Sequence, residues 1–407
     1  MDVDMKTGSM EAVTEIEAVS TQDLRIFSLD FTGLEWDSVR VNGVDAQFER
    51  RIRKLVITPA EPLEKDSPFT VEVAYHGTPW TVTSVSGGTV GWFRAMDGTI
   101  NIFTEPDGAY SWFPCNNHPR DKALYRFEIT VDDPWVAAAN GLLIETIPQD
   151  QQKTTYVFEL NEPMATYLAT VHIDKFDLVT MTGPNNIQIR DYIPADFPQE
   201  KREILQLIPE IIEFYNGIFG PYPSTVYGVL VMDVNATHCA TSPFGDETQS
   251  LTILCPAVVR EVTFVHELAH EWFGDSVSIE NWQDLWVKEG MAQYAGCLWE
   301  ARDGDATDLN NCMIEEAKDY PNRWPVDEPP PNNLFCSEAY TGGAMVYHSL
   351  HLLVGDEVFF DIARTFLDRY RGGSAGTDEL IAVVNEVSGQ DLEETIRGWL
   401  KDPEIPK

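Results

Sequence analysis

Residues 266–270 read His-Glu-Leu-Ala-His, inside a stretch whose apolar residues recur with helical spacing. Because positions i and i+4 lie on one helical face, both imidazoles can reach the same ion. Zinc accepts nitrogen and carboxylate ligands, and a catalytic site takes three from the protein and keeps one position open. Glu289 follows His270 after 18 intervening residues, within the next expected helix. The pattern predicts one zinc ion per chain, bound by His266, His270 and Glu289.

The residues on both sides of this motif favour helices. Apolar residues at 204, 207, 208, 211, 212 and 215 form a helix face. Two strand-like runs, Tyr227–Val234 and Ser250–Leu254, precede the motif, and a proline-rich loop covers 321–331. Further helices are predicted near 258–273, 284–302, 307–319, 340–354, 357–371, 377–387 and 391–400.

In the first part of the chain, apolar residues recur with a different period. Runs such as Phe69–Tyr75 and Tyr125–Val131 alternate apolar and polar residues and end at turn residues, which is typical of strands. The period changes near Thr182-Gly183-Pro184. We therefore predict an α+β multidomain protein, with a β-sheet-rich domain over 1–182 and a mostly helical catalytic domain over 183–407.

Composition excludes several classes of partner. The 407 residues carry 28 Lys and Arg against 66 Asp and Glu, a net charge of −38. Phosphate backbones and anionic membrane surfaces repel such a chain, so we expect no nucleic-acid partner. No apolar run is long enough to span a membrane. The acidic, polar start has no secretory pattern, so the expected location is cytoplasmic, or secreted with the signal already removed.

The six cysteines show no Cys-x-x-Cys spacing, which argues against a cysteine zinc site and a disulfide-dense scaffold. One or two disulfides stay open as an alternative, but reduced, buried thiols are favoured. Nothing in the sequence determines the oligomeric state, and a monomer is the default expectation.

Two segments, His-Glu-Leu-Ala-His-Glu-Trp-Phe-Gly-Asp-Ser-Val at 266–277 and Trp-Gln-Asp-Leu-Trp-Val-Lys-Glu-Gly at 282–290, resemble the aminopeptidase N family of zinc metallopeptidases. This gluzincin family also contains leukotriene hydrolase. Residues 105–123, 247–249 and 340–344 look like further family motifs, and the ending Gly398-Trp399-Leu400 is similar to short, two-domain members. The resemblance implies a thermolysin-like catalytic domain and a zinc-dependent aminopeptidase that hydrolyses N-terminal residues from peptides.

The chemistry of a catalytic zinc site assigns the first roles. Bound zinc lowers the pKa of its water and polarises a scissile carbonyl. Glu267, next to a ligand, is the expected general base, which takes a proton from the water and returns it to the leaving amine. By resemblance, the Tyr340 hydroxyl stabilises the oxyanion. By resemblance also, Glu247 and Glu105 bind the free α-amine of the substrate, from which an aminopeptidase measures one residue.

Three positions depart from the family pattern. Only Glu247 survives from the family's Gly-x-Met-Glu-Asn motif, Gly342 replaces the usual Lys of the tyrosine motif, and Lys288 replaces the usual Asn before the third ligand. These departures leave open how the substrate backbone is held and which first side chain is preferred.

Other functions remain as alternatives. A thermolysin-type zinc endopeptidase shares the His-Glu-x-x-His logic but lacks the Glu105 and Glu247 anchor. A catalytically inactive binding module could keep the same fold, although the intact ligands and base argue against it. An epoxide hydrolase like the leukotriene enzyme rests on family analogy alone.

Overall fold

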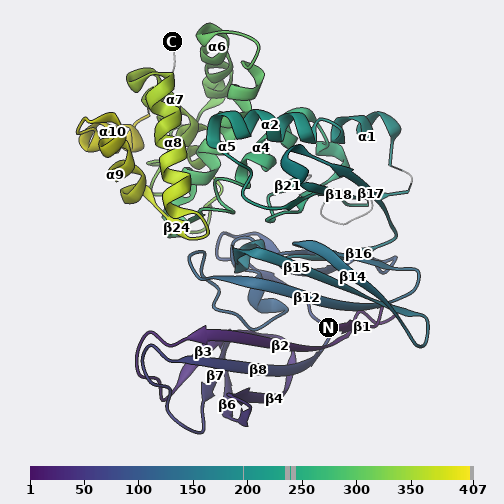
Figure 1. Ribbon diagram of the computed structural model, residues 1–407. Coiled ribbons are helices and arrows are strands. Elements are labelled where there is room, and N and C mark those ends of the chain that lie inside the picture. The colour runs from purple at the N-terminus through teal and green to yellow at the C-terminus, as the bar shows by residue number, and fades with distance from the viewer. Residues whose placement is uncertain (196, 234–238, 240–243, 404–407) are drawn as a thin grey trace.

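The computed structural model describes residues 1–195, 197–233, 239 and 244–403 (Figure 1). Strands form the first half, and a mostly helical second half is stacked on it, with the layer of β12, β14, β15 and β16 between the helices and the outermost strands. The predicted α+β architecture is confirmed. Among the described residues, no helix combines the length and apolar character needed to cross a membrane.

Three sheets make up the first half. The largest has the order β14 (Leu142–Gln149), β15 (Lys153–Ala165), β12 (Lys122–Asp132), β1 (Asp2–Val3), β2 (Met10–Val19), β8 (Pro68–Gly77), β4 (Glu35–Val41), β5 (Val44–Asp45). The second has the order β13 (Val136–Ala139), β16 (Val171–Asp174), β11 (Ile100–Phe103), β10 (Thr89–Arg94), β9 (Thr81–Thr83). The third has the order β3 (Phe27–Asp30), β7 (Lys54–Thr58), β6 (Gln47–Arg51).

A mixed sheet opens the second half, in the order β17 (Phe176–Thr182), β18 (Gln188–Pro194), β20 (Val229–Val231), β22 (Thr252–Leu254), β21 (Gly245–Asp246), with β19 (Val226–Tyr227) beside β18. The last residue of the predicted strand 227–234 lies outside the described residues. Because β17 belongs to this sheet, the change from one set of sheets to the next falls between β16 and β17. The domain division after residue 182 itself stays a prediction.

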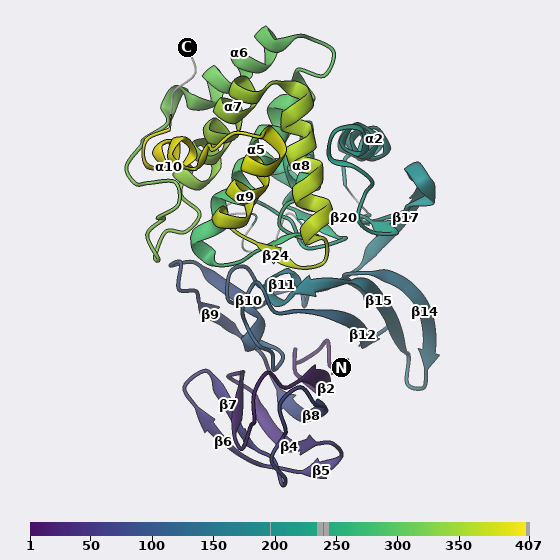
Figure 2. The same cartoon turned by 60° about the vertical axis from the view of Figure 1, so that its left-hand side comes forward.

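The helices follow the predicted order (Figure 2). They are α1 (Gln199–Leu205), α2 (Ile208–Phe219), α4 (Glu261–His270), α5 (Leu285–Glu300), α6 (Ala306–Glu316), α7 (Gly343–Val354), α8 (Asp356–Tyr370), α9 (Thr377–Ser388) and α10 (Glu393–Lys401). A short parallel pair, β23 (Ser278–Ile279) and β24 (Ser374–Ala375), ties the loop after α4 to the loop after α8. The single helix face predicted over 204–215 is two helices, because Pro209 lies in the first turn of α2 and cannot continue α1.

The preference for reduced cysteines is wrong for four of the six residues. Cys239 pairs with Cys255, and Cys297 pairs with Cys312, with Cα–Cα distances of 5.2 and 5.6 Å. Cys115 and Cys336 are free and buried. The second bridge joins α5, which carries Glu289, to α6. Spacing in the sequence holds no signal for such pairs, because it does not say which helices pack together.

Candidate metal centre and active site

Two packed helices bring the three predicted ligands together. His266 and His270 lie one turn apart on α4, and Glu289 lies in the second turn of α5. Gly274, in the turn after α4, has φ +124°, a backbone conformation that favours glycine. His270 and Glu289 are buried, whereas the His266 side chain keeps 18% of its surface exposed. The metal centre is therefore buried at His270 and Glu289 and accessible from outside at His266.

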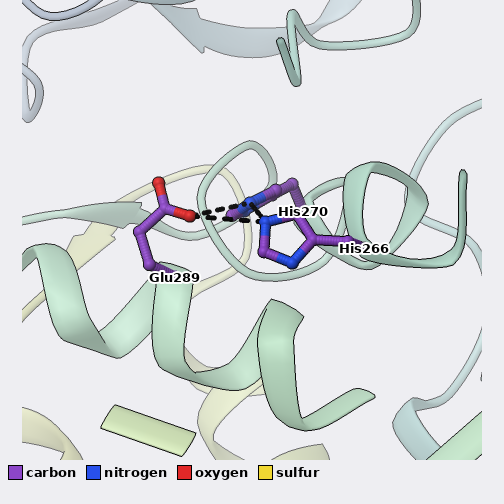
Figure 3. Close-up of side chains that lie close together, drawn as sticks. All are labelled: His266, His270 and Glu289. Atoms are coloured by element: carbon purple, nitrogen blue, oxygen red, sulfur yellow. Dashed lines mark hydrogen bonds and ion pairs between the residues drawn. The ribbon is translucent and has the colours of Figure 1, made fainter. Parts of the chain in front are cut away.

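The three ligand atoms form a small triangle (Figure 3). His266 Nε2 and His270 Nε2 lie 3.2 Å apart, and Glu289 Oε2 lies 3.5 Å from the first and 3.3 Å from the second. Ligands at about 2.0–2.1 Å from a tetrahedral zinc lie roughly 3.3–3.4 Å from one another. These residues thus fit a zinc ion without rearrangement.

A backbone contact fixes the tautomer of one ligand. His270 Nδ1 lies 3.0 Å from the Phe273 carbonyl oxygen, to which an Nδ1–H donates, leaving the Nε2 lone pair for a metal. Burial opposes protonation of His270, but the Glu247 and Glu289 charges outweigh burial and raise its pKa to about 9. The pocket thus favours a cation at this position.

Glu267 lies on the same helix between the two histidines and is buried. A carboxylate oxygen of Glu267 lies within 4.8 Å of a carboxylate oxygen of Glu247 and of a ring nitrogen of His270. Gly245 of β21 packs on it so closely that a Cβ there would overlap the Glu267 carboxylate. Burial raises the pKa of Glu267 well above its usual range, so this carboxyl has a high affinity for a proton.

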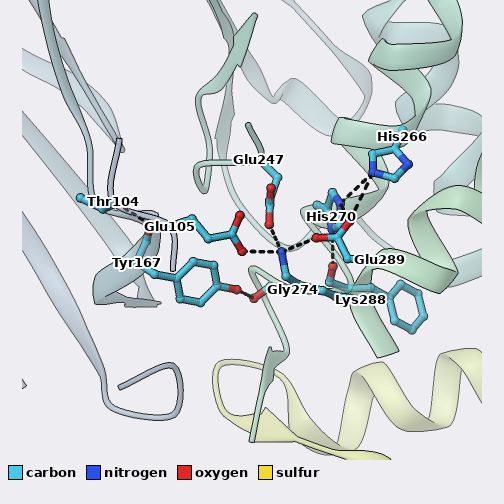
Figure 4. A network of polar contacts seen from close by, with 10 residues as sticks. Thr104, Glu105, Tyr167, Glu247, His266, His270, Gly274, Lys288 and Glu289 are labelled. Atoms are coloured by element: carbon cyan, nitrogen blue, oxygen red, sulfur yellow. Dashed lines mark hydrogen bonds and ion pairs between the residues drawn. The ribbon is translucent and has the colours of Figure 1, made fainter. Parts of the chain in front are cut away.

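The predicted amine anchors meet beside the metal centre (Figure 4). Glu105 follows β11 in the first half of the chain, and Glu247 follows β21 in the second. The Lys288 ammonium joins them: Nζ lies 2.8 Å from Glu105 Oε1, 2.8 Å from Glu289 Oε1, and also donates to Glu247 Oε1. Within the described part of the chain, the Oε2 atoms of Glu105 and Glu247 accept no hydrogen bond.

The carboxylates of this buried cluster differ in pKa. Burial opposes ionisation of Glu289, but Lys288 and His270 outweigh it and hold its pKa well below the usual range. Burial also opposes ionisation of Glu247, but the same two cations outweigh it and lower its pKa. Burial and the Glu247 charge together raise the pKa of Glu105 well above its usual range. Two carboxylates that share one ammonium therefore differ in proton affinity.

Tyr340 reaches the centre from a π-helical turn, Glu338–Gly342, directly before α7. Its ring stacks on the His266 imidazole, with ring centroids 6.1 Å apart and planes inclined by 18°. Close contact between Gly290 on α5 and Gly343 on α7 sets this placement, because a Cβ at either glycine would meet the other helix's backbone. A Cβ at Gly342 would lie 2.7 Å from the Tyr320 hydroxyl, so the lysine usual in the family has no room.

Contacts between the two halves hold the loops of the site. The Lys122 ammonium on β12 donates to the carbonyls of Asp275 (2.6 Å), Ser276 (3.0 Å) and Gly373 (3.3 Å). The Tyr167 hydroxyl donates to the Gly274 carbonyl at 3.0 Å. Asn140 Nδ2 donates to the carbonyl of Gln249, two residues after Glu247, at 2.8 Å. The first half thus positions both the turn after α4 and the Glu247 loop.

Sequence analysis did not predict one member of this cluster, Lys288. In the sequence, Lys288 differs from the family pattern only as the residue before the third ligand, and no basic residue neighbours Glu105 or Glu247 along the chain. Its side chain is 1% exposed, and its ammonium contacts three carboxylates from three segments. A buried lysine is rare unless it is paired, but the sequence does not show burial, and the available signal was only the Lys in place of the usual Asn directly before Glu289.

Two family models match this chain. The peptidase M1 N-terminal domain matches residues 1–168, and the peptidase family M1 domain matches residues 256–399. The "Probable aminopeptidase 1" of Saccharolobus solfataricus is 26% identical over 99% of the chain, and the glutamyl aminopeptidase of Bos taurus is 24% identical over 88%. The chain spans about half the length of the first of these curated relatives and 40% of the second.

A solved structure covers the same two halves. It is an M1 zinc metallopeptidase from Deinococcus radiodurans, a mutant bound to a Tyr-Ser-Ala substrate, with a TM-score of 0.89 and 26% identity. The likeness covers 98% of this chain and 92% of that one. The fold is that of the two-domain M1 zinc metallopeptidases. The chain belongs to peptidase family M1, as its motifs predict.

Proposed function

We propose that this chain is a zinc-dependent aminopeptidase that removes N-terminal residues from peptides with a free α-amine. The observation that carries the proposal is the arrangement of Glu105 and Glu247. Their carboxylates come from different halves of the chain and share one ammonium with Glu289, a predicted zinc ligand. A cation-binding pair next to a metal centre is what an exopeptidase needs, because it must recognise the amine and cleave one residue away.

Each residue of the metal centre has its own role in the proposed reaction. His266, His270 and Glu289 would hold the zinc, which when bound would act as a Lewis acid and lower the pKa of a water. The Glu267 carboxylate takes a proton from the attacking water and delivers it to the leaving amine. The Tyr340 hydroxyl, on the His266 side, donates a hydrogen bond to the oxygen of the attacked carbonyl.

The amine subsite uses the oxygens that Lys288 does not. Lys288 contacts Oε1 of Glu105 and Oε1 of Glu247. The substrate ammonium binds the two Oε2 atoms, while Lys288 keeps both carboxylates at a fixed distance from Glu289. The α-amine thus has a defined position relative to the metal ligands, and the domain junction, a common place for clefts, forms the subsite.

One assay separates this proposal from its alternatives. A peptide with a free amine and the same peptide with an acetylated amine are incubated with the protein, with and without a metal chelator. An aminopeptidase cleaves the first peptide alone and loses activity to the chelator. A zinc endopeptidase cleaves both peptides at internal bonds, and a binding module binds them without cleavage. Either of the last two results would refute the proposal.

Tyr340→Phe removes the proposed oxyanion donor and nothing else. We expect kcat to fall by roughly 10²–10³-fold, because one donor to the developing charge is lost. Zinc content and KM stay close to those of the parent, as measured by metal analysis and steady-state kinetics. Tyr370→Phe, at the end of α8, is the matched control and keeps full activity. A change confined to KM would instead assign Tyr340 to substrate binding.

Glu247→Ala removes half of the amine subsite, and Glu105→Ala removes the other half. A charge-assisted hydrogen bond contributes about 1.5–3 kcal/mol, so kcat/KM for free-amine peptides falls by roughly 10–100-fold in each variant. The low rate on acetylated peptides stays nearly unchanged, so the selectivity ratio collapses. Glu17→Ala, on the exposed face of β2, is the control. Equal loss on both kinds of peptide would contradict an amine-binding role.

A further inference from the structure

Asp246 is a carboxylate of the active site that the proposed reaction leaves unused. It ends β21, where antiparallel pairing with Ile253 of β22 fixes its backbone. Only 7% of its surface is exposed, yet within the described part of the chain its carboxylate accepts no hydrogen bond and forms no ion pair. The family's Gly-x-Met-Glu-Asn motif has methionine at this position, so the motif assigns no role to a carboxylate here.

The Asp246 side chain faces the amine subsite. One of its oxygens lies within 4.8 Å of an oxygen of Glu105 and of an oxygen of Glu247, and these two lie within 4.8 Å of one another. The loop that follows is held in place, because the Ser250 amide donates to Glu271 Oε1 at 2.7 Å. Three carboxylates from the two halves of the chain therefore meet at one fixed place.

The cations of this cluster already have other partners. An ammonium has three N–H donors, and Lys288 directs its three to the carboxylates described above, none of which is Asp246. The His270 ring contacts the Phe273 carbonyl through Nδ1 and turns Nε2 to the predicted zinc. Burial and the Glu247 charge raise the pKa of Asp246 to about 8, and Lys288 offsets this only in part. The described chain thus supplies no cation to the Asp246 carboxylate.

We propose that Asp246 is a specificity-determining residue that accepts the third hydrogen bond of the substrate α-ammonium. Glu105 and Glu247 accept the other two. Acceptors at about 2.7–2.9 Å from a tetrahedral nitrogen lie roughly 4.4–4.7 Å apart, within the limit that the three carboxylates meet. A divalent cation in the same place would lie beside the Lys288 ammonium, which repels it. The inference rests on the proposed aminopeptidase function and adds one residue to its amine subsite.

Three acceptors select the class of amine that the subsite binds. A primary ammonium offers three N–H donors, whereas the secondary ammonium of an N-methylated residue or of proline carries the same charge with only two. Its extra carbon would take the place of one donor and leave the Asp246 carboxylate buried without a partner, which is costly. The subsite therefore favours peptides whose first residue has a primary amine over peptides that begin with an N-methylated residue or proline.

One pair of peptides separates hydrogen bonding from charge. The free-amine peptide of the assay above is compared with the same peptide carrying one methyl group on that amine. We expect the parent protein to favour the primary amine by roughly 100-fold or more in kcat/KM. In Asp246→Met this ratio falls by about tenfold or more, because the primary amine loses an acceptor and the methyl group meets an apolar side chain. Asp45→Asn, exposed on β5, is the control and keeps the parent ratio.

Binding without turnover separates this inference from the proposed function. Zinc-loaded Glu267→Gln protein, with and without Asp246→Met, is titrated with both peptides by calorimetry, and the ratio of the two Kd values is expected to fall by the same factor. If the parent protein cleaved no free-amine peptide, the proposed function would fail, and the Kd ratio would still test Asp246. Asp246→Ala, which removes the acceptor without adding volume, serves if the methionine variant does not fold.

A ratio that stays at the parent value in the Asp246 variants would refute the inference, whether the two rates fall equally or not at all. A parent protein that treats the methylated and unmethylated peptides alike would also refute it. A loss confined to peptides that begin with Lys or Arg would assign Asp246 to the side chain of the first residue and overturn its role at the α-amine.

Discussion

Glu267→Gln is expected to keep zinc and to lose nearly all turnover. Glutamine has the same size as glutamate but cannot take a proton from the nucleophilic water, and loss of a general base costs roughly 10²–10⁴-fold in rate. The three ligand atoms on His266, His270 and Glu289 are untouched. Metal analysis and kcat measured on the same zinc-loaded sample check both halves of this expectation.

Glu261→Gln is the matched control, because Glu261 lies on the same helix and its side chain accepts a hydrogen bond from the Trp299 indole, not from any residue of the centre. The control variant keeps parent activity. A zinc-loaded Glu267→Gln protein that turns over at the parent rate would show that another group takes the proton.

His270→Ala is expected to abolish stoichiometric zinc binding and, with it, activity. Zinc in a catalytic site depends on three protein ligands, and this change removes the more buried of the two imidazoles. Metal per chain after dialysis is the measurement, with circular dichroism as a check on folding.

His76→Ala is the control for metal content, because His76 is exposed and its ring contacts Asp37 on β4 of the eight-stranded sheet. This variant keeps one zinc per chain. If folded His270→Ala protein also kept one zinc per chain, the ion would have other ligands than those assigned here.

The metal centre was predictable because its information is local. Two histidines one turn apart on a helix meet whatever the rest of the chain does, and Glu289 follows on the next helix, after a connection that contains β23 and a 3-10 turn over 282–284. The strand-rich and helical halves were predictable for the same reason, because apolar residues recur with a period of 2 in strands and of 3.6 in helices. Glu105 and Glu247 needed the family resemblance, because 141 residues of intervening chain carry no spacing rule.

The remaining features depend on which segments meet in space. Lys288 joins Glu105, Glu247 and Glu289, and no pattern around residue 288 indicates this. The bridge from Cys297 to Cys312 requires α5 and α6 to pack side by side. Non-local contacts of this kind are set by tertiary packing, which residue periodicity does not encode.

Because a π-helical turn carries Tyr340, this site depends on the number of residues in that turn as well as on their identity. A π turn accommodates one more residue than an α turn, and such turns often occur at functional sites. Deleting one residue between Glu338 and Gly342 would restore ordinary α-helical geometry and rotate the side chains before the gap by roughly 100° about the helix axis. Tyr340 would then leave the His266 ring although its own codon is unchanged. Single-codon insertions and deletions here are therefore expected to be as harmful as substitution of the tyrosine itself.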